Sequence, residues 1–298
     1  MGPVQLPTRL PYPTQWPEYI PRIFGRSRRA RVAATSIAAV PLAALFRQRR
    51  RGELEPIATT PEALRERFQL RRDARVVATG VDQDDDIERL WHYHDEAPLG
   101  RWLREMGIEV ATAPNYSYFA YAPRDHFLWN RKRMLLFVAR LAQDQFPVVP
   151  HIYGETGFDY RWWASFYREH PHLTSFVVEL QTSDAEVDRL PIMVEHLKQF
   201  RDLVDRPLTA LVIGGRHAIR RLAPIFDSLV VIEASAYMKT IRRRLAFNNG
   251  RKLRWKKIES RGNLDALLDH NIAAIGESIG GDMNAARGRI VPRAATAA

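Results

Sequence analysis

From residue 75 onward the chain alternates short β-branched apolar runs with longer helical stretches. Near-continuous apolar strands separated by helices are typical of a parallel sheet that is covered on both faces. The pattern therefore predicts an α/β protein, and each crossover between strands is expected to be right-handed. The predicted strands are 75–81, 108–113, 146–152, 175–180, 208–213 and 228–234. The predicted helices are 86–106, 127–145, 160–170, 184–204, 216–226 and 237–246.

Polar side chains follow every one of the six apolar runs. In a closed (β/α) barrel, ligand groups gather at the carboxyl ends of many strands, whereas an open doubly wound sheet collects them at one switch point. We therefore predict a (β/α) barrel-like parallel sheet, incomplete or irregular, with an open doubly wound sheet as the alternative. Two further apolar stretches, 253–258 and 272–275, would bring the number of strands to eight.

The first 71 residues differ in composition from the rest. Prolines recur from Pro3 to Pro21, which disfavours both helix and ladder pairing and predicts an extended arm lying on another surface. Thr60 and Pro61 are typical of the start of a helix. We therefore divide the chain into a Pro-rich, basic N-terminal arm with short helices (1–71) and an α/β barrel-like domain with a basic C-terminal part (72–298). The arm is a candidate for docking on a protein partner.

No segment is predicted to insert into a membrane. The uncharged stretch 32–46 follows an Arg-rich run, but it contains Pro41 and continues directly into further arginines. Its 15 residues also fall short of the ~20 that cross a bilayer. We expect a cytoplasmic protein. The chain has no cysteine, so any metal would be held by carboxylate and imidazole groups.

The formal charge of +11 is segregated along the chain. Residues 1–75 carry +9, residues 76–215 carry −7 and residues 216–298 carry +9. Basic ends around an acidic middle predict that the ends meet an anionic partner. An anion is not expected at the barrel mouth unless a divalent cation or Arg216 reverses the local sign there.

The strongest electrostatic feature lies between Glu233 and Glu259, where no acidic residue occurs. Tyr237, Phe247 and Trp255 alternate there with basic groups, which suits a nucleic-acid backbone together with stacking on unpaired bases. The alternatives are a solvated charged face and recognition of a phosphoester at the barrel mouth. The predicted DNA- or RNA-binding residues are Lys239, Arg242, Arg243, Arg244, Arg251, Lys252, Arg254, Lys256 and Lys257, and the basic stretch 26–51 is a second candidate.

Several short motifs recur in the order of a known family. They are Val81 to Trp91, an acidic strand end before a helix; Pro114-Asn115-Tyr116-Ser117; Pro150 to Gly154; and Val212 to Gly215. Over about residues 72–245 the chain resembles the prokaryotic domain-of-unknown-function family 4417, which is common on phages, plasmids and other mobile elements. The resemblance implies a barrel-like α/β fold and no particular chemistry. Asn115 stands where that family has an acid.

Two groups of side chains are candidates for chemistry. Asp82 and Asp84 follow the first strand, and carboxylates of this kind bind Mg²⁺ or Mn²⁺; alternatively, Asp84 to Asp86 cap the next helix and complement its positive end. The second group combines a general base with carboxylates, or else forms a structural ion-pair network. The predicted catalytic residues are Asp82, His151, Glu155, Glu179 and Glu233.

Three functions follow from these patterns. The first is a mobile-element-type barrel protein that binds nucleic acid through its basic ends. The second is a barrel enzyme that uses a metal or acid/base groups on a small or phosphorylated substrate, and the third is a structural or assembly protein. The sequence contains no Walker A loop, G-x-G-x-x-G fingerprint, H-E-x-x-H or G-x-S-x-G motif, which disfavours ATP-driven, dinucleotide-dependent and α/β-hydrolase chemistry.

Overall fold

The computed structural model describes residues 6, 10–25, 31–50, 52–116, 122–180, 184–249, 252–258 and 264–288, and for 184–188 it describes the backbone alone. Eight strands form two four-stranded sheets in which every pairing is parallel. In order across the first sheet these are β1 (Tyr19–Pro21), β10 (Ser228–Glu233), β9 (Thr209–Gly214) and β8 (Ser175–Leu180). In the second sheet they are β2 (Ile37–Pro41), β5 (Arg75–Thr79), β6 (Val110–Thr112) and β7 (Val148–Val149).

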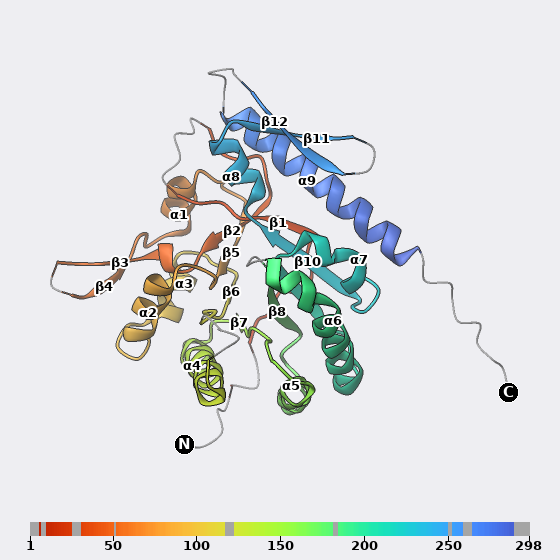
Figure 1. The fold of residues 1–298 in the computed structure, drawn as a ribbon. Coiled ribbons are helices and arrows are strands. Elements are labelled where there is room, and N and C mark those ends of the chain that lie inside the picture. Colours follow the sequence, from red (N-terminus) through yellow and green to blue (C-terminus); the bar gives the residue numbers. More distant parts are fainter. Residues whose placement is uncertain are drawn as a thin grey trace.

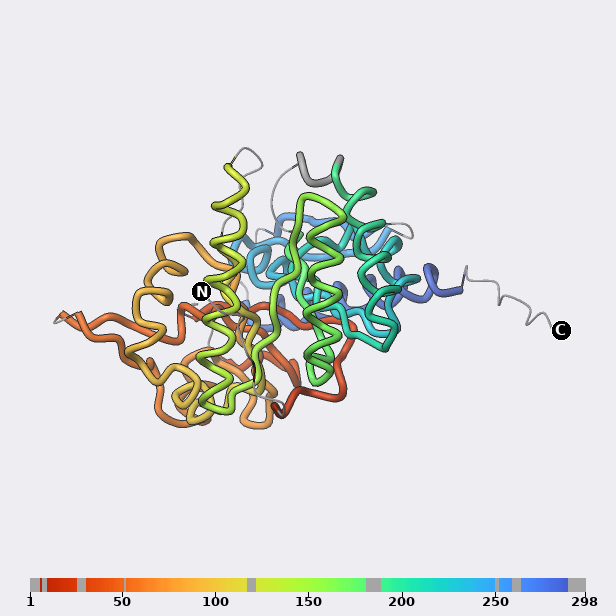
Figure 2. Tube along the Cα trace, turned by 90° about the horizontal axis from the view of Figure 1, so that it is seen from below, coloured from red at the N-terminus to blue at the C-terminus, as the bar shows by residue number. Residues whose placement is uncertain are grey.

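Helices flank the two sheets, and Figure 2 shows the three longest of the mid-chain helices, α4, α5 and α6, alongside one another. The helices are α1 (Pro61–Phe68), α2 (Asp84–His92), α3 (Leu99–Glu105), α4 (Arg124–Gln143), α5 (Gly157–Glu169), α6 (Asp184–Val204), α7 (Ile219–Leu222), α8 (Ser235–Ile241) and α9 (Leu264–Arg287), with 3-10 turns at η1 (Ala43–Leu45) and η2 (Arg216–Ala218). The predicted mixed α/β class with parallel strands is therefore confirmed.

The edges of the two sheets meet at both sides. Arg22, next to β1, forms a parallel bridge with Ala39 of β2, and His151, just beyond β7, forms one with Val177 of β8. An inner apolar cluster takes side chains from all eight strands: Ile20, Ile37, Ala39, Val77, Val110, Val149, Val177, Leu211, Ile213, Val230 and Ile232. The hydrogen-bonded ladders nevertheless form two sheets rather than one closed barrel.

The two strands that complete the set of eight come from the N-terminal segment, so the expectation that 253–258 and 272–275 would supply them was wrong. Residues 272–275 lie inside α9, where Leu268, Ile275 and Ile279 recur at helical spacing and are buried. Residues 253–257 do form a strand, β12 (Leu253–Lys257), but it pairs antiparallel with β11 (Arg244–Asn248) in a separate hairpin. A second hairpin joins β3 (Phe46–Gln48) and β4 (Leu54–Pro56).

The expectation that prolines prevent ladder pairing near residue 21 was also wrong. The backbone groups that bond to β10 belong to Glu18, whose carbonyl accepts from Val231 N at 2.9 Å, and to Arg22, whose N–H donates to Glu233 O at 2.8 Å. Alternation along the strand points Pro21 away from β10, so its missing N–H removes no bond on that side. β1 and β2 thus pair with strands beyond residue 71, while the proposed domain boundary stays a prediction.

The start of α1 agrees with the sequence pattern. Thr60 accepts a hydrogen bond from Ala63 N at 3.2 Å, and Pro61 occupies the first turn. The predicted helix 237–246 ends early, because Arg243 takes a left-handed φ of 51° and the chain turns into β11. The predicted helix 86–106 is divided into α2 and α3, with Pro98 at the start of the second helix.

Candidate nucleic-acid interface and adjoining cleft

The β11–β12 hairpin carries most of the basic residues predicted to bind nucleic acid. Its register pairs Phe247 with Arg254 and Leu245 with Lys256 on one face. On the other face Ala246 and Leu253 are buried, and β11 contacts α9. One side of the hairpin therefore packs on the fold while the side with Phe247, Arg254 and Lys256 is exposed. Figure 1 shows the hairpin lying along α9 at the edge of the molecule.

The exposed side of the hairpin combines an aromatic ring with cations that have no acidic partner. Phe247 is 42% exposed. Within the part of the chain that the structure describes, no ion pair involves Arg254 or Lys256. Of the other predicted residues, Lys239, Arg242, Arg243, Lys252 and Lys257 are described close by in the chain, whereas Arg251 lies outside the described residues. The ammonium of Lys239 lies 5.7 Å from the centre of the Trp255 ring.

A buried asparagine on α9 holds the hairpin in place. The side chain of Asn271 accepts from Ala246 N at 2.8 Å and donates to Arg244 O and Thr240 Oγ1, both at 2.9 Å. His270 Nε2 donates to Ala246 O at 2.7 Å. α9 thus fixes β11 and α8 together, chiefly through the fully buried side chain of Asn271.

We expect Asn271→Ala to lower the free energy of unfolding by about 3 kcal/mol, because it leaves the buried N–H of Ala246 and the part-buried carbonyl of Arg244 without the partners they have in α9. Chemical denaturation measures the change. Asn284→Ala, an exposed position on the same helix, is the matched control and should change the free energy by less than about 0.5 kcal/mol. Equal effects at the two positions would contradict the anchoring role of Asn271.

A cleft of about 650 Å³ lies between the hairpin, α9 and the carboxyl ends of β9 and β10. Its walls include Lys252 and Trp255 from the hairpin side and Arg216 and Glu233 from the sheet. Arg220, also in the wall, is paired with Asp282 at 2.7 Å. The cleft is therefore continuous with the basic hairpin and carries both signs of charge.

Glycine is required for the turn that brings Arg216 to the cleft. Gly215 has a left-handed φ of 62°, and a Cβ there would lie 2.5 Å from Leu180 Cβ. The same side of the cleft holds Glu233, at the end of β10, which is only 7% exposed and whose Oε1 has no hydrogen-bond partner among the described residues. Burial raises the pKa of Glu233, and the charge of Arg216 partly opposes that rise.

Asp82 and Glu233 are brought to the same end of the sheets by Arg22. The buried Arg22 guanidinium donates to Val81 O and lies 4.0 Å from Asp82 Oδ2, while its backbone N–H donates to Glu233 O. Burial raises the pKa of Asp82, and the Arg22 charge acts against that rise. Arg22 carries no recognisable signal in the sequence, because its role depends on the pairing of β1 with β10, and the prolines before it argue against such pairing.

The remaining predicted catalytic residues are His151, Glu155 and Glu179. The His151 ring bonds to the Ala113 backbone, its Nε2 has no partner among the described residues, and burial lowers its pKa to about 3. Glu155 Oε2 lies 4.0 Å from Arg124 Nη1, and Glu179 is half-buried in β8. A catalytic role for these three residues stays a prediction.

Asp84 begins α2, and Asp85 and Asp86 follow in the same first turn. Acidic groups at this position complement the positive end of the helix, which was the alternative interpretation of this cluster. Among the described residues, no group of three or more His, Asp or Glu side chains is arranged to hold a metal ion. Binding of Mg²⁺ or Mn²⁺ by Asp82 and Asp84 stays a prediction.

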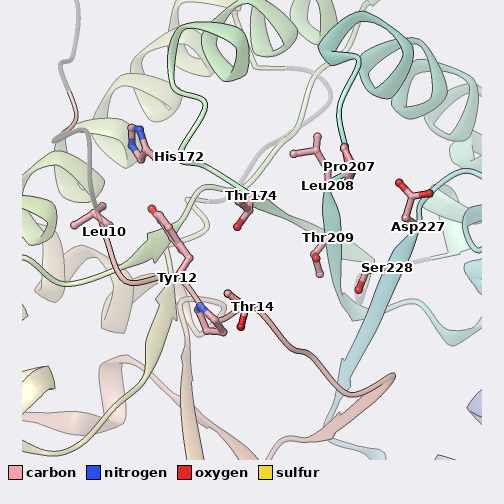
Figure 3. A pocket seen from close by; sticks show the side chains of 11 residues that line it. Leu10, Tyr12, Thr14, His172, Thr174, Pro207, Leu208, Thr209, Asp227 and Ser228 are labelled. Carbon is pink, nitrogen blue, oxygen red and sulfur yellow. The ribbon is translucent and has the colours of Figure 1, made fainter.

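A second pocket, of about 540 Å³, lies at the amino ends of β8, β9 and β10 and holds none of the predicted site residues. Figure 3 shows Tyr12 and Thr14 of the N-terminal arm on one side of it and Thr209 and Ser228 on the other. The Tyr12 hydroxyl donates to Val148 O at 2.9 Å, so this part of the arm is attached to the protein's own β7.

No protein-family model matches the chain, and no curated protein matches it. The resemblance to family 4417 therefore stays a prediction. In the described part of the chain, every helix is too short or too polar to cross a membrane.

Proposed function

We propose that this protein binds nucleic acid through the exposed side of the β11–β12 hairpin. The observation that carries the proposal is the placement of Arg254 and Lys256 beside the exposed Phe247, without an acidic partner among the described residues. Unpaired cations attract a phosphate backbone, and an aromatic ring offers a stacking surface for an unpaired base. Single-stranded DNA or RNA fits this combination better than a duplex, whose bases are already stacked.

The adjoining cleft lies on the other face of the hairpin, which Trp255 and Leu253 share with Ala246. Lys252, in the turn between the two strands, lines the cleft, and Arg216 adds positive charge on the sheet side. A strand that follows the exposed face as far as this turn would therefore meet the cleft at Lys252. The buried Glu233 would limit how far an anion enters.

The two sheets serve, in this proposal, as one barrel-like frame that supports the hairpin. The parallel bridges at both sheet edges and the inner apolar cluster from all eight strands support that view. In this proposal the two sheets, joined by one bridge at each pair of edges, form an irregular barrel. Association with a mobile element rests on the family resemblance alone.

Binding should weaken steeply with salt. If four to six phosphates are neutralised, the affinity for a single strand should fall by about 100-fold between 50 and 200 mM salt, because binding releases counterions and higher salt makes that release less favourable. Fluorescence anisotropy with a labelled 20-nucleotide DNA and the RNA of the same sequence measures this dependence. Lack of binding at 50 mM salt, or an affinity that does not change with salt, would overturn the proposal.

A further inference from the structure

A second group of basic side chains lies far from the hairpin, within the net acidic middle of the chain. Tyr116 follows β6, Tyr153 follows β7, and Arg131 and Arg133 lie on α4. We call these four residues the Arg–Tyr cluster. Figure 1 shows α4 and β7 well separated from β11 and β12.

Each member of the Arg–Tyr cluster has a buried polar atom without a hydrogen-bond partner. These atoms are the hydroxyls of Tyr116 and Tyr153, Nη1 of Arg131 and Nε of Arg133. Buried polar groups in folded proteins are nearly always hydrogen-bonded, and each exception calls for an explanation. Four such atoms in one place indicate a partner that the described residues do not supply.

The four groups lie close enough to act on one another. The Arg133 guanidinium carbon is 4.0 Å from the centre of the Tyr116 ring, and the Tyr153 ring packs edge-on against Phe127, which also contacts Arg131. The positive charges of both arginines act on the Tyr153 hydroxyl. Burial raises the pKa of both phenols, so both hydroxyls stay protonated and able to donate near neutral pH.

The acidic groups nearby do not satisfy these donors. Asp159 accepts from Arg124 Nη1 at 2.9 Å and from Thr156, and it lies 3.5 Å from Arg131 Nη1 without a hydrogen bond to that atom. Glu88 accepts from Nη2 of Arg133, but its own side chain is 54% exposed and it leaves Nε unpaired. Among the described residues, the two phenol hydroxyls, Arg131 Nη1 and Arg133 Nε are therefore left without an acceptor.

We propose that the Arg–Tyr cluster binds a small oxyanion, namely the carboxylate or phosphate group of a ligand. Guanidinium groups recognise both kinds of anion through charge-assisted hydrogen bonds, and the two hydroxyls add neutral donors. The rings of Trp91 and Trp162 stack against Arg133 and Arg131 and hold the guanidiniums in place. This site is separate from the nucleic-acid surface and does not depend on it.

The test is a titration of the full chain with inorganic phosphate and, separately, with acetate, at constant ionic strength maintained with sodium chloride. Calorimetry gives the Kd, and thermal denaturation gives the Tm. Tyr116→Phe and Tyr153→Phe remove one unpartnered hydroxyl each. Tyr167→Phe is the matched control, because the Tyr167 hydroxyl is buried and donates to Ser175 O at 2.9 Å.

We expect phosphate, acetate or both to raise the Tm of the wild type. Each of the two cluster variants should raise the Kd for the anion by about tenfold without lowering the Tm of the ligand-free protein. The control should lower the Tm and leave the Kd unchanged. A response to only one of the two anions identifies the ligand group. The same variants should bind nucleic acid like the wild type, so this proposal and the hairpin proposal can fail independently.

Two results would overturn the proposal. One is the absence of any Tm shift with either anion. The other is a Kd that is unchanged in both cluster variants, which would place the bound anion elsewhere on the protein.

Discussion

Replacing Arg254 and Lys256 together with glutamate should weaken the binding of single-stranded DNA or RNA by at least about 100-fold at 0.1 M salt. The change removes two cations and adds two anions on the exposed side of the hairpin, where no described acidic group lies against them. Reversing both charges replaces attraction to phosphate by repulsion at the centre of the proposed surface. Titration of the labelled 20-nucleotide strands measures the loss.

The fold should tolerate this double variant. Both side chains are exposed and lie on the side of the hairpin opposite the buried Ala246 and Leu253. The matched control is Arg104→Glu with Arg168→Glu, two exposed positions on α3 and α5, which makes the same change in net charge. A similar loss of affinity in the control would show that only net charge matters and would contradict a hairpin surface.

Acid should destabilise the protein through His151. Its folded-state pKa is lowered from 6.5 to about 3 because the ring is completely buried. Above pH 6.5 both the folded and the unfolded states carry a neutral imidazole, so His151 contributes no pH dependence there. As the pH falls from about 6.5 to about 3, the unfolded state takes up a proton that the folded state does not, and the free energy of unfolding decreases.

The expected slope from this one group approaches about 1.4 kcal/mol per pH unit, or on the order of 4 kcal/mol over the whole interval. His151→Gln keeps a polar side chain but cannot be protonated, so the difference between its curve and that of the wild type isolates the histidine. Denaturation by urea at intervals from pH 7.5 to pH 4 provides both curves. Parallel curves would contradict a histidine that is buried and neutral.

The effect of His151 must be taken from the difference between the wild-type and His151→Gln curves, because carboxylates also make the free energy of unfolding fall with acid. Hydrogen bonds from Arg124 and Thr156 lower the pKa of Asp159 against the opposing effect of its burial. A lowered carboxyl pKa also makes stability fall with acid, as the pH approaches the folded-state pKa. Asp159 is unchanged in both proteins, so its contribution cancels.

The strands that could be predicted from the sequence are those whose own apolar side chains are enough to require a buried position. All six predicted runs contain a strand of the two sheets, because β-branched apolar residues in short blocks have few other stable environments. β1 and β2 carried no such signal: one is three residues long and ends in proline, and the other contains two alanines. Their pairing is decided by the strands beside them, which the local sequence does not contain.

The candidate sites follow the same division. The basic and aromatic content of residues 239–257 is a property of composition and was visible in the sequence. The sequence did not show that this region divides into α8, a left-handed turn at Arg243 and a hairpin, because basic residues occur in helices and in exposed strands alike. The Arg–Tyr cluster had no sequence signal, because its members come from two strand ends and a helix that only the fold brings together.

The sequence by itself therefore determined the α/β class, the parallel strands and the concentration of positive charge at the two ends of the chain, because hydrophobic periodicity and net charge are sums over neighbouring residues. Only the tertiary structure decided which strands complete the sheets, which arginines face a carboxylate and which buried donors have no acceptor. Ion pairing and hydrogen bonding depend on distances between residues that are remote in the chain, and these distances exist only after the chain has folded.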